Sequence, residues 1–177
     1  MTVLVFDNSV LSHFARADAV DELCSLTVQY ECVTLDEVVK ELVRGVDRHP
    51  ALAATLGLRW LTIKELATVE EIVAFARYKN ELGGGLDRNM GEAAVLAWAV
   101  VHNSIAIIDE RAATRIARRD GIAVHGSLWL VANGVRTGKL ERAAAEQIVD
   151  ALYASEMKLP VDGAGFFAWA YNEGLLP

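Results

Sequence analysis

The chain has 177 residues, of which 53% are hydrophobic and 23% charged, and its formal net charge is −7 at pH 7. This composition is typical of one compact, ordered domain and excludes a largely disordered chain. The acidic balance argues against a protein that binds nucleic acid through its overall charge, although a bound cation would change the field locally. The apolar start, Met1–Phe6, is too short for a signal peptide, and no apolar run approaches the roughly 20 residues that span a bilayer. We therefore expect a cytoplasmic protein that does not contact membranes.

Short apolar runs alternate with segments of helical period in the first part of the chain. Thr2–Phe6, Tyr30–Thr34 and Leu58–Ile63 predict strands, and helices are predicted at Asn8–Ala17 and Asp36–Arg44. The side chains expected to face inward are Val10, Leu11 and Phe14 on the first helix, and Val38, Val39, Leu42 and Val43 on the second. A glycine, Gly45, is expected to end the second helix.

The same alternation continues to the C-terminus. Helices are predicted at Val69–Leu82, Met90–His102 and Arg111–Arg119, and strands at Ser104–Ile108 and Ile122–Val124. From Ser127 onward the pattern is helical, with breaks expected at Gly134, Gly138, Pro160 and Gly163–Gly165. Strands that alternate with helices predict an α/β fold with a mostly parallel sheet covered on both faces.

Acidic residues follow two of the predicted strands. Asp7 comes directly after Val3–Phe6, and Asp109 directly after Ile105–Ile108. If both strands are central, the two carboxylates emerge at the edge of the sheet where ligands bind in such folds. Carboxylates held close together raise each other's pKa, and a hard divalent cation such as Mg²⁺ removes that cost. Two further acids, Glu41 and Glu92, lie on predicted helices that could flank this edge.

Each of these acids also has a purely structural interpretation. Asp7 and Asp109 could be the N-cap residues of the helices that follow them. Glu41 could be a solvent-facing partner of a neighbouring cation, and Glu92 a first-turn acid that favours the helix N-terminus. Spacing alone leaves both interpretations open.

Short motifs around these acids resemble one known family, the PIN domains, which include VapC-like ribonuclease toxins and related small prokaryotic proteins. The matching segments, in the family's order, are Val5–Leu11, Val38–Gly45, Gly91–Ala97, Ile107–Ala113 with Arg115–Ala117, and Gly121–Val124 with Gly126–Leu128. The matches span Thr2 to about Leu140. The resemblance implies a three-layer α/β/α fold with a mostly parallel central sheet. It implies a single domain over residues 1–177, with a core of about 1–140 and a helical C-terminal extension of about 141–177.

The resemblance also implies an activity, hydrolysis of RNA phosphodiester bonds assisted by Mg²⁺ or Mn²⁺. Asp7, Glu92 and Asp109 are then the expected metal ligands, and Glu41 completes the catalytic set. Three polar residues could support the metal ligands from outside: Asn8, Ser9 and Glu110. Asn8 and Ser9 could hydrogen-bond the carboxylates, and both could equally cap a helix. Many small PIN proteins are toxins of toxin–antitoxin pairs, so the resemblance further implies an antitoxin partner and a homo-oligomer, with a dimer as the expected form.

Cations near Asp109 are candidates for contacts with RNA phosphates. Arg111, Arg115 and Arg118 recur at spacings of four and three, so they share one face of the predicted helix. This face either positions phosphates or is simply solvated. The histidines, in contrast, show no metal-ligand spacing and are expected to be structural: His13, His49, His102 and His125.

Aromatic residues near the C-terminus suggest an interaction surface for a second copy or an antitoxin. Phe166 and Trp169 fall on one predicted helical stripe, and Phe167 and Tyr171 on an adjoining one. Together the two stripes make a face wider than one docking contact requires. The alternative is that this helix simply caps the core.

Two other functions remain open at this stage. The first is a PIN-like module that binds RNA or protein without cutting it; such a module would act with or without divalent metal. The second is a phosphatase of the haloacid-dehalogenase type, which also places an Asp after its first strand. That family has a second Asp two residues later, where this chain has Ser9.

Overall fold

The computed structural model describes residues 1–85 and 87–177 and contains a five-stranded, fully parallel sheet with the order β3-β2-β1-β4-β5. The strands are β1 Val3–Phe6, β2 Glu31–Leu35, β3 Leu61–Lys64, β4 Ile105–Ile107 and β5 Val124–His125. The first strand is thus the central one, flanked by β2 and β4. The expected α/β fold and the adjacency of the strands that precede Asp7 and Asp109 are both confirmed.

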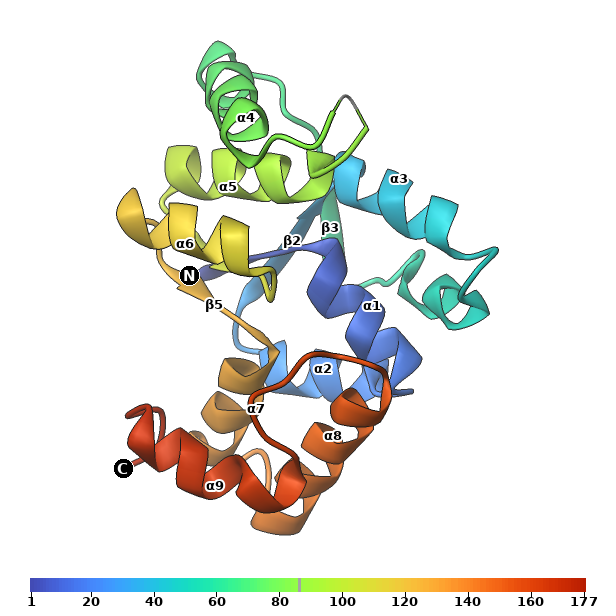
Figure 1. The fold of residues 1–177 in the computed structure, drawn as a ribbon, viewed down its shortest axis with the longest axis vertical. Coiled ribbons are helices and arrows are strands. Elements are labelled where there is room, and N and C mark those ends of the chain that lie inside the picture. The colour runs from blue at the N-terminus through green and yellow to red at the C-terminus, as the bar shows by residue number, and fades with distance from the viewer. Residues whose placement is uncertain (86) are drawn as a thin grey trace.

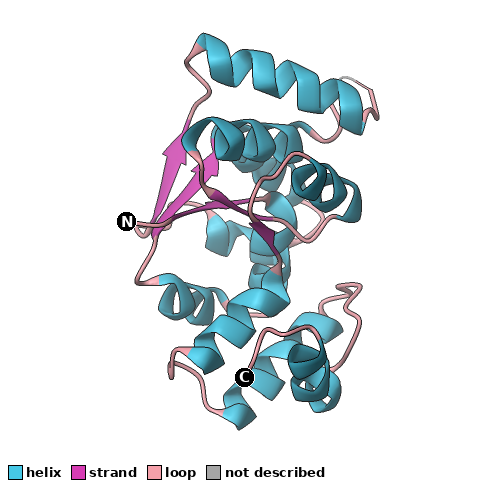
Figure 2. Ribbon diagram, turned by 90° about the vertical axis from the view of Figure 1, so that its left-hand side faces the viewer, coloured by secondary structure: helices cyan, strands magenta, loops and turns pink. Residues whose placement is uncertain are grey.

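Helices cover both faces of this sheet. They are α1 Asn8–Arg16, α2 Val20–Thr27, α3 Asp36–Gly45, the 3₁₀ helix η1 Pro50–Thr55, α4 Val69–Leu82, α5 Met90–His102, α6 Arg111–Arg119, α7 Ser127–Arg136, α8 Arg142–Ala154 and α9 Gly163–Asn172. Figure 1 shows α4 and α5 on one side of the sheet and α2 with α7, α8 and α9 on the other; Figure 2 shows the same layering from the side. Within the described ranges, no helix is both long and apolar enough to cross a membrane.

The core is built around β1 and α5. The β1 side chains Leu4, Val5 and Phe6 have no exposed surface, and neither do the five consecutive residues Ala93–Ala97 of α5. This helix is apolar on all sides because it contacts the sheet on one side and α4 on the other. The packing fixes the first turn of α5, which carries Glu92, beside the carboxyl ends of the strands.

Several details differ from the sequence-based expectations. Val43 is 52% exposed and Val39 only partly buried, because α3 packs through a single narrow stripe that contains Val38 and Leu42. Gly134 does not break a helix: it lies inside α7, where a Cβ would overlap the Leu26 side chain of α2. The expected break at Gly163–Gly165 is instead the start of α9. Two short elements, α2 and η1, are not predicted by the sequence pattern.

The prediction of a wide, exposed aromatic face near the C-terminus is also wrong. Phe166 and Phe167 are 0% and 5% exposed, whereas Tyr171 is 51% exposed. The helix α9 packs on α8, and the Arg142 guanidinium lies over the Phe167 ring at 4.2 Å from its centre. These aromatic side chains mainly close the core, in line with the alternative interpretation.

Candidate active site

The carboxyl ends of β1 and β4 bring Asp7 and Asp109 to the same edge of the sheet. The pairing of Phe6 with Ile107 aligns the strands, and the Asp7 backbone N–H donates to the Ile107 carbonyl at 3.0 Å. Ser9 connects the two acids. Its hydroxyl donates to Asp7 Oδ2 at 2.5 Å and accepts a hydrogen bond from the Asp109 backbone N–H at 3.3 Å.

Asp7 is fully buried, and its two carboxylate oxygens have different surroundings. Oδ2 accepts from the Ser9 backbone as well as its hydroxyl, which makes Asp7 the N-cap of α1. Oδ1 is buried and has no hydrogen-bond partner among residues 1–85 and 87–177. Burial, with a contribution from the Glu41 charge, raises the pKa of Asp7 from 3.8 to about 6 although the Ser9 hydrogen bonds oppose the shift. The capping role and a ligand-binding role are therefore compatible, since they use different oxygens.

Glu41 reaches this edge from α3 and is held there by the N-terminus of α5. Its Oε1 accepts from the Gly91 backbone N–H at 2.9 Å, and its Oε2 accepts from Asn8 Nδ2 at 3.4 Å. A Cβ at residue 91 would lie 2.8 Å from Glu41 Oε2. Glycine at this position thus allows the helix terminus to approach the carboxylate closely.

Glu92 completes the group of interacting charges. It is partly buried, and its Oε2 is enclosed without a hydrogen-bond partner in the described part of the chain. Burial raises the pKa of Glu92 from 4.5 to about 8, and the charges of Asp7, Glu41 and Glu110 contribute. The structure therefore gathers four acids whose negative charges oppose one another: Asp7, Glu41, Glu92 and Glu110.

Asp109 lies in a different environment from Asp7. Both of its oxygens accept hydrogen bonds from Ser127: Oδ1 from the backbone N–H at 2.8 Å and Oδ2 from the hydroxyl at 2.6 Å. Burial raises its pKa, and these two bonds oppose the rise. Gly126 makes this arrangement possible, because a Cβ there would overlap Asp109 Oδ1.

The other predicted polar residues support the acids in different ways. Asn8 donates to Glu41 and accepts from the Ser12 hydroxyl at 2.7 Å, which fixes its amide. Glu110 is the N-cap of α6 and accepts from the Ala113 backbone N–H at 2.8 Å. Its negative charge also contributes to the raised pKa of Glu92.

Three residues of the site, Ser127, Gly126 and Gly91, have no role that the sequence predicts. All three lie within segments that match the family pattern, so a signal is present there. The motifs do not indicate which residues contact one another in the fold. Ser127 and Asp109 are 18 positions apart, and Gly91 and Glu41 are 50 positions apart. Only the folded arrangement brings each pair together.

The donor atoms fit a hard divalent cation at Asp7 and Glu92. Among the described residues, no three Asp, Glu, His or Cys side chains form a ready metal-binding group. Mg²⁺, however, is commonly held by one or two carboxylates and keeps several waters. In the described part of the chain four buried side-chain oxygens lack a hydrogen-bond partner, and two of them, Asp7 Oδ1 and Glu92 Oε2, lie at this site, where a cation would supply the missing interaction.

Arginines of α6 line a cavity that also includes Asp109. Arg111, Arg115 and Arg118 face this space of about 620 Å³, and Lys158 and Trp129 contribute to its other walls. The three arginines therefore share one face of α6, as expected, and this face lines a cavity that also contains Asp109. Arg119, on another side of α6, pairs with Glu81 and Asp120 on the surface.

Comparisons with known proteins agree with this architecture. A family model described as a PIN domain matches residues 3–162. One similar solved chain comes from the crystal structure of VapBC2 from Rickettsia felis bound to a DNA fragment from their promoter; it is 12% identical, has a TM-score of 0.50, and the match covers 71% of this chain and 98% of that one. At this identity the likeness concerns the fold. No curated protein matches the sequence. Since the family model spans most of the chain, the protein belongs to the PIN-domain family.

Proposed function

We propose that this protein is a metal-dependent endoribonuclease and the toxin of a toxin–antitoxin pair. The observation that carries the proposal is that Asp7 Oδ1 and Glu92 Oε2, both buried and without a hydrogen-bond partner among residues 1–85 and 87–177, lie in one group of mutually repelling acids. Leaving buried carboxylates uncompensated costs several kcal/mol. A site that tolerates this cost is organised for a ligand of opposite charge.

The acids have distinct roles in this proposal. Asp7 and Glu92 would hold Mg²⁺ or Mn²⁺, and Asp109 is a further candidate ligand. A divalent cation bound there supplies charge neutralisation at the phosphate and a lower pKa for a bound water. Glu41, fixed by Gly91 and Asn8, lies beside these acids and can accept a proton or orient water.

Hydrogen bonds to the acids keep them in place. Ser9 donates hydrogen bonds to Oδ2 of Asp7 and not to Oδ1. Ser127 donates hydrogen bonds to both oxygens of Asp109. Such supporting contacts orient metal ligands and commonly change metal affinity or activity by about 10–100-fold when removed.

RNA as the substrate is supported by the cations beside this acidic group. The cavity with Arg111, Arg115 and Arg118 reaches Asp109, so a strand bound along it would pass this carboxylate. Guanidinium groups bind phosphates through paired hydrogen bonds. On a chain with a net charge of −7, such a local group of cations offsets the repulsion of a polyanion.

An antitoxin partner is supported by the family and by the fold neighbour. The similar solved chain comes from a structure of VapBC2 bound to promoter DNA, and the PIN family that the sequence motifs resemble includes VapC-like toxins. We propose that this chain likewise pairs with an antitoxin and forms a homodimer. Expression of the wild type without its antitoxin should then arrest growth, whereas the Asp7→Asn protein should not.

The central experiment is cleavage of a mixed pool of single-stranded RNA with Mn²⁺. The wild type should cleave, excess chelator should abolish cleavage, and Asp7→Asn or Glu92→Gln should lower the rate by about 100-fold or more. Equal RNA binding with and without metal, and no cleavage in either case, would favour the non-catalytic module. Full activity of Asp7→Asn would refute the assigned site.

A further inference from the structure

A second cavity, of about 670 Å³, lies where α1 and α3 meet the turn before η1. Asn8 and Glu41 line one part of it, so it adjoins the acidic group on the side away from α6. Arg16, Arg48 and His49 line the other part. The acidic site is thus bordered by two arginines and a histidine on this side.

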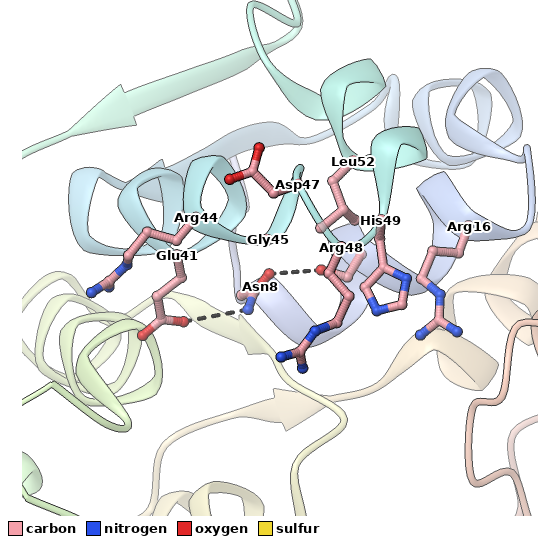
Figure 3. Close-up of a pocket in the computed structure, with 10 residues that line it drawn as sticks. Asn8, Arg16, Glu41, Arg44, Gly45, Asp47, Arg48, His49 and Leu52 are labelled. Carbon is pink, nitrogen blue, oxygen red and sulfur yellow. Dashed lines mark hydrogen bonds between the residues drawn. The ribbon is translucent and has the colours of Figure 1, made fainter.

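The turn after α3 places the side chains of Arg48 and His49 in this cavity. The Gly45 carbonyl accepts hydrogen bonds from the backbone N–H groups of both Arg48 and His49, at 3.1 and 2.9 Å. A Cβ at Gly45 would lie 2.7 Å from Leu52 Cδ1, so the glycine lets η1 pack against the end of α3. Figure 3 shows the side chains of Arg48, His49 and Arg16 extending side by side, while Asp47 points the opposite way.

These groups have unused hydrogen-bonding capacity. In residues 1–85 and 87–177, neither the Arg48 guanidinium nor the His49 ring makes a hydrogen bond or an ion pair. Arg16 pairs at 2.7 Å with Glu156, whose side chain is 82% exposed. Exposed ion pairs contribute little to stability, so a ligand can recruit Arg16 from this pair.

We propose that Arg48, His49 and Arg16 form a binding subsite for a phosphate of single-stranded RNA, next to the bond that is cut. The inference rests on the proposed nuclease function. Asp7, Glu41, Glu92 and Glu110 repel a polyanion, and the guanidinium groups of Arg48 and Arg16 in the adjoining cavity reduce that repulsion. Guanidinium groups match phosphate oxygens in shape and charge. Asn8, which lines the cavity and binds Glu41, joins the subsite to the catalytic carboxylates.

The test compares Arg48→Gln, His49→Gln and their double variant with Arg59→Gln, an exposed arginine outside both cavities. Binding of a labelled single-stranded RNA oligonucleotide is measured in chelator, where no cutting occurs. The double variant should bind about 10-fold more weakly than the wild type, and the slope of log Kd against log salt should fall by about 0.7 for each phosphate that the protein no longer neutralises. Arg59→Gln should change Kd by less than about twofold.

Cleavage kinetics separate this inference from the proposed function. If the wild type cuts RNA, the double variant should raise KM about 10-fold and change kcat by less than about threefold. Normal cleavage by the wild type with equal Kd and KM for the double variant and Arg59→Gln would overturn the subsite and leave the nuclease intact. Binding that depends on Arg48 in a wild type that cannot cut would retain the subsite and refute the nuclease. Loss of antitoxin binding without any change in RNA affinity would assign the cavity to a protein partner and overturn the proposal.

Discussion

Asp7 and Asp109 show how one residue type at equivalent positions acquires different properties. Both follow adjacent parallel strands, and burial raises the pKa of both. Ser127 donates hydrogen bonds to both oxygens of Asp109, whereas Oδ1 of Asp7 has no hydrogen-bond partner among the residues that the structure describes. The position after a strand could be predicted from the sequence. The partners could not, because they come from residues that are distant along the chain.

The raised pKa values of Asp7 and Glu92 predict how stability depends on pH in metal-free protein. Each acid binds its proton more tightly in the folded state than in the unfolded state. The pKa of Asp7 rises from 3.8 to about 6 on folding, and that of Glu92 rises from 4.5 to about 8. Their contribution to the free energy of unfolding therefore falls as pH rises through these windows. At pH 8 in chelator, Asp7→Asn should be more stable than the wild type by about 1–3 kcal/mol.

Urea unfolding of both proteins at pH 5 and pH 8 measures this effect. The advantage of Asp7→Asn should shrink at pH 5, where the wild-type carboxyl is largely protonated. An Asp7→Asn protein that is less stable than the wild type at pH 8 would show that the carboxylate is not under electrostatic stress.

Ser127→Ala tests the support of Asp109. The substitution removes the hydroxyl that donates to Oδ2 and leaves the backbone bond to Oδ1. Cleavage should fall about 10–100-fold, the range typical of contacts that orient a metal ligand. Ser25→Ala, at an exposed serine on α2, is the control. Wild-type activity of Ser127→Ala would show that Asp109 needs no such support.

At the scale of elements, the bounds of three helices could be predicted from the sequence, but not those of others, including the 13-residue α8. The observed bounds of α4, α5 and α6 coincide with those expected, because each has enough residues to show helical period or clear composition. The missed elements α2 and η1 are short, and the two-residue strand β5 lies slightly later than expected. Tertiary packing decides such elements, and so it also decides the contacts that depend on them, including that of Ser127.

Two helical glycines are predicted to respond differently to alanine. At Gly91 the nearest neighbour of an added Cβ is the end of the flexible Glu41 side chain, 2.8 Å away. Gly91→Ala should therefore cost less than about 1 kcal/mol of stability, while displacing Glu41 and lowering activity about 10-fold or more. At Gly134 the Cβ would overlap the buried Leu26, and overpacking of this kind costs about 1–3 kcal/mol.

Thermal unfolding and cleavage rates of the two variants should give opposite patterns. Gly134→Ala should melt at a lower temperature and retain its rate below the melting transition. If Gly91→Ala cleaves RNA as fast as the wild type, the position of Glu41 is not important for activity.

For the whole molecule, the acidic group links folding to metal binding. A ligand that binds only the native state stabilises it by about 2.7 kcal/mol at a concentration about 100 times its Kd. Mn²⁺ should thus raise the Tm of the wild type, and by much less that of a protein carrying both Asp7→Asn and Glu92→Gln. An equal rise in both proteins would mean that the metal binds elsewhere.

The central place of β1 has a consequence during protein synthesis. Ser9 and Asp109, which bind each other at the site, are 100 positions apart, and β1 leaves the ribosome long before its neighbour β4 exists. A nascent chain that already carries Asp7, Glu41 and Glu92 lacks the strand that encloses Asp7 and the segment that holds Asp109. Contacts between such distant residues form late. If the protein is the toxin that we propose, a chain truncated before Ser127, the last residue of the described site, should therefore lack activity.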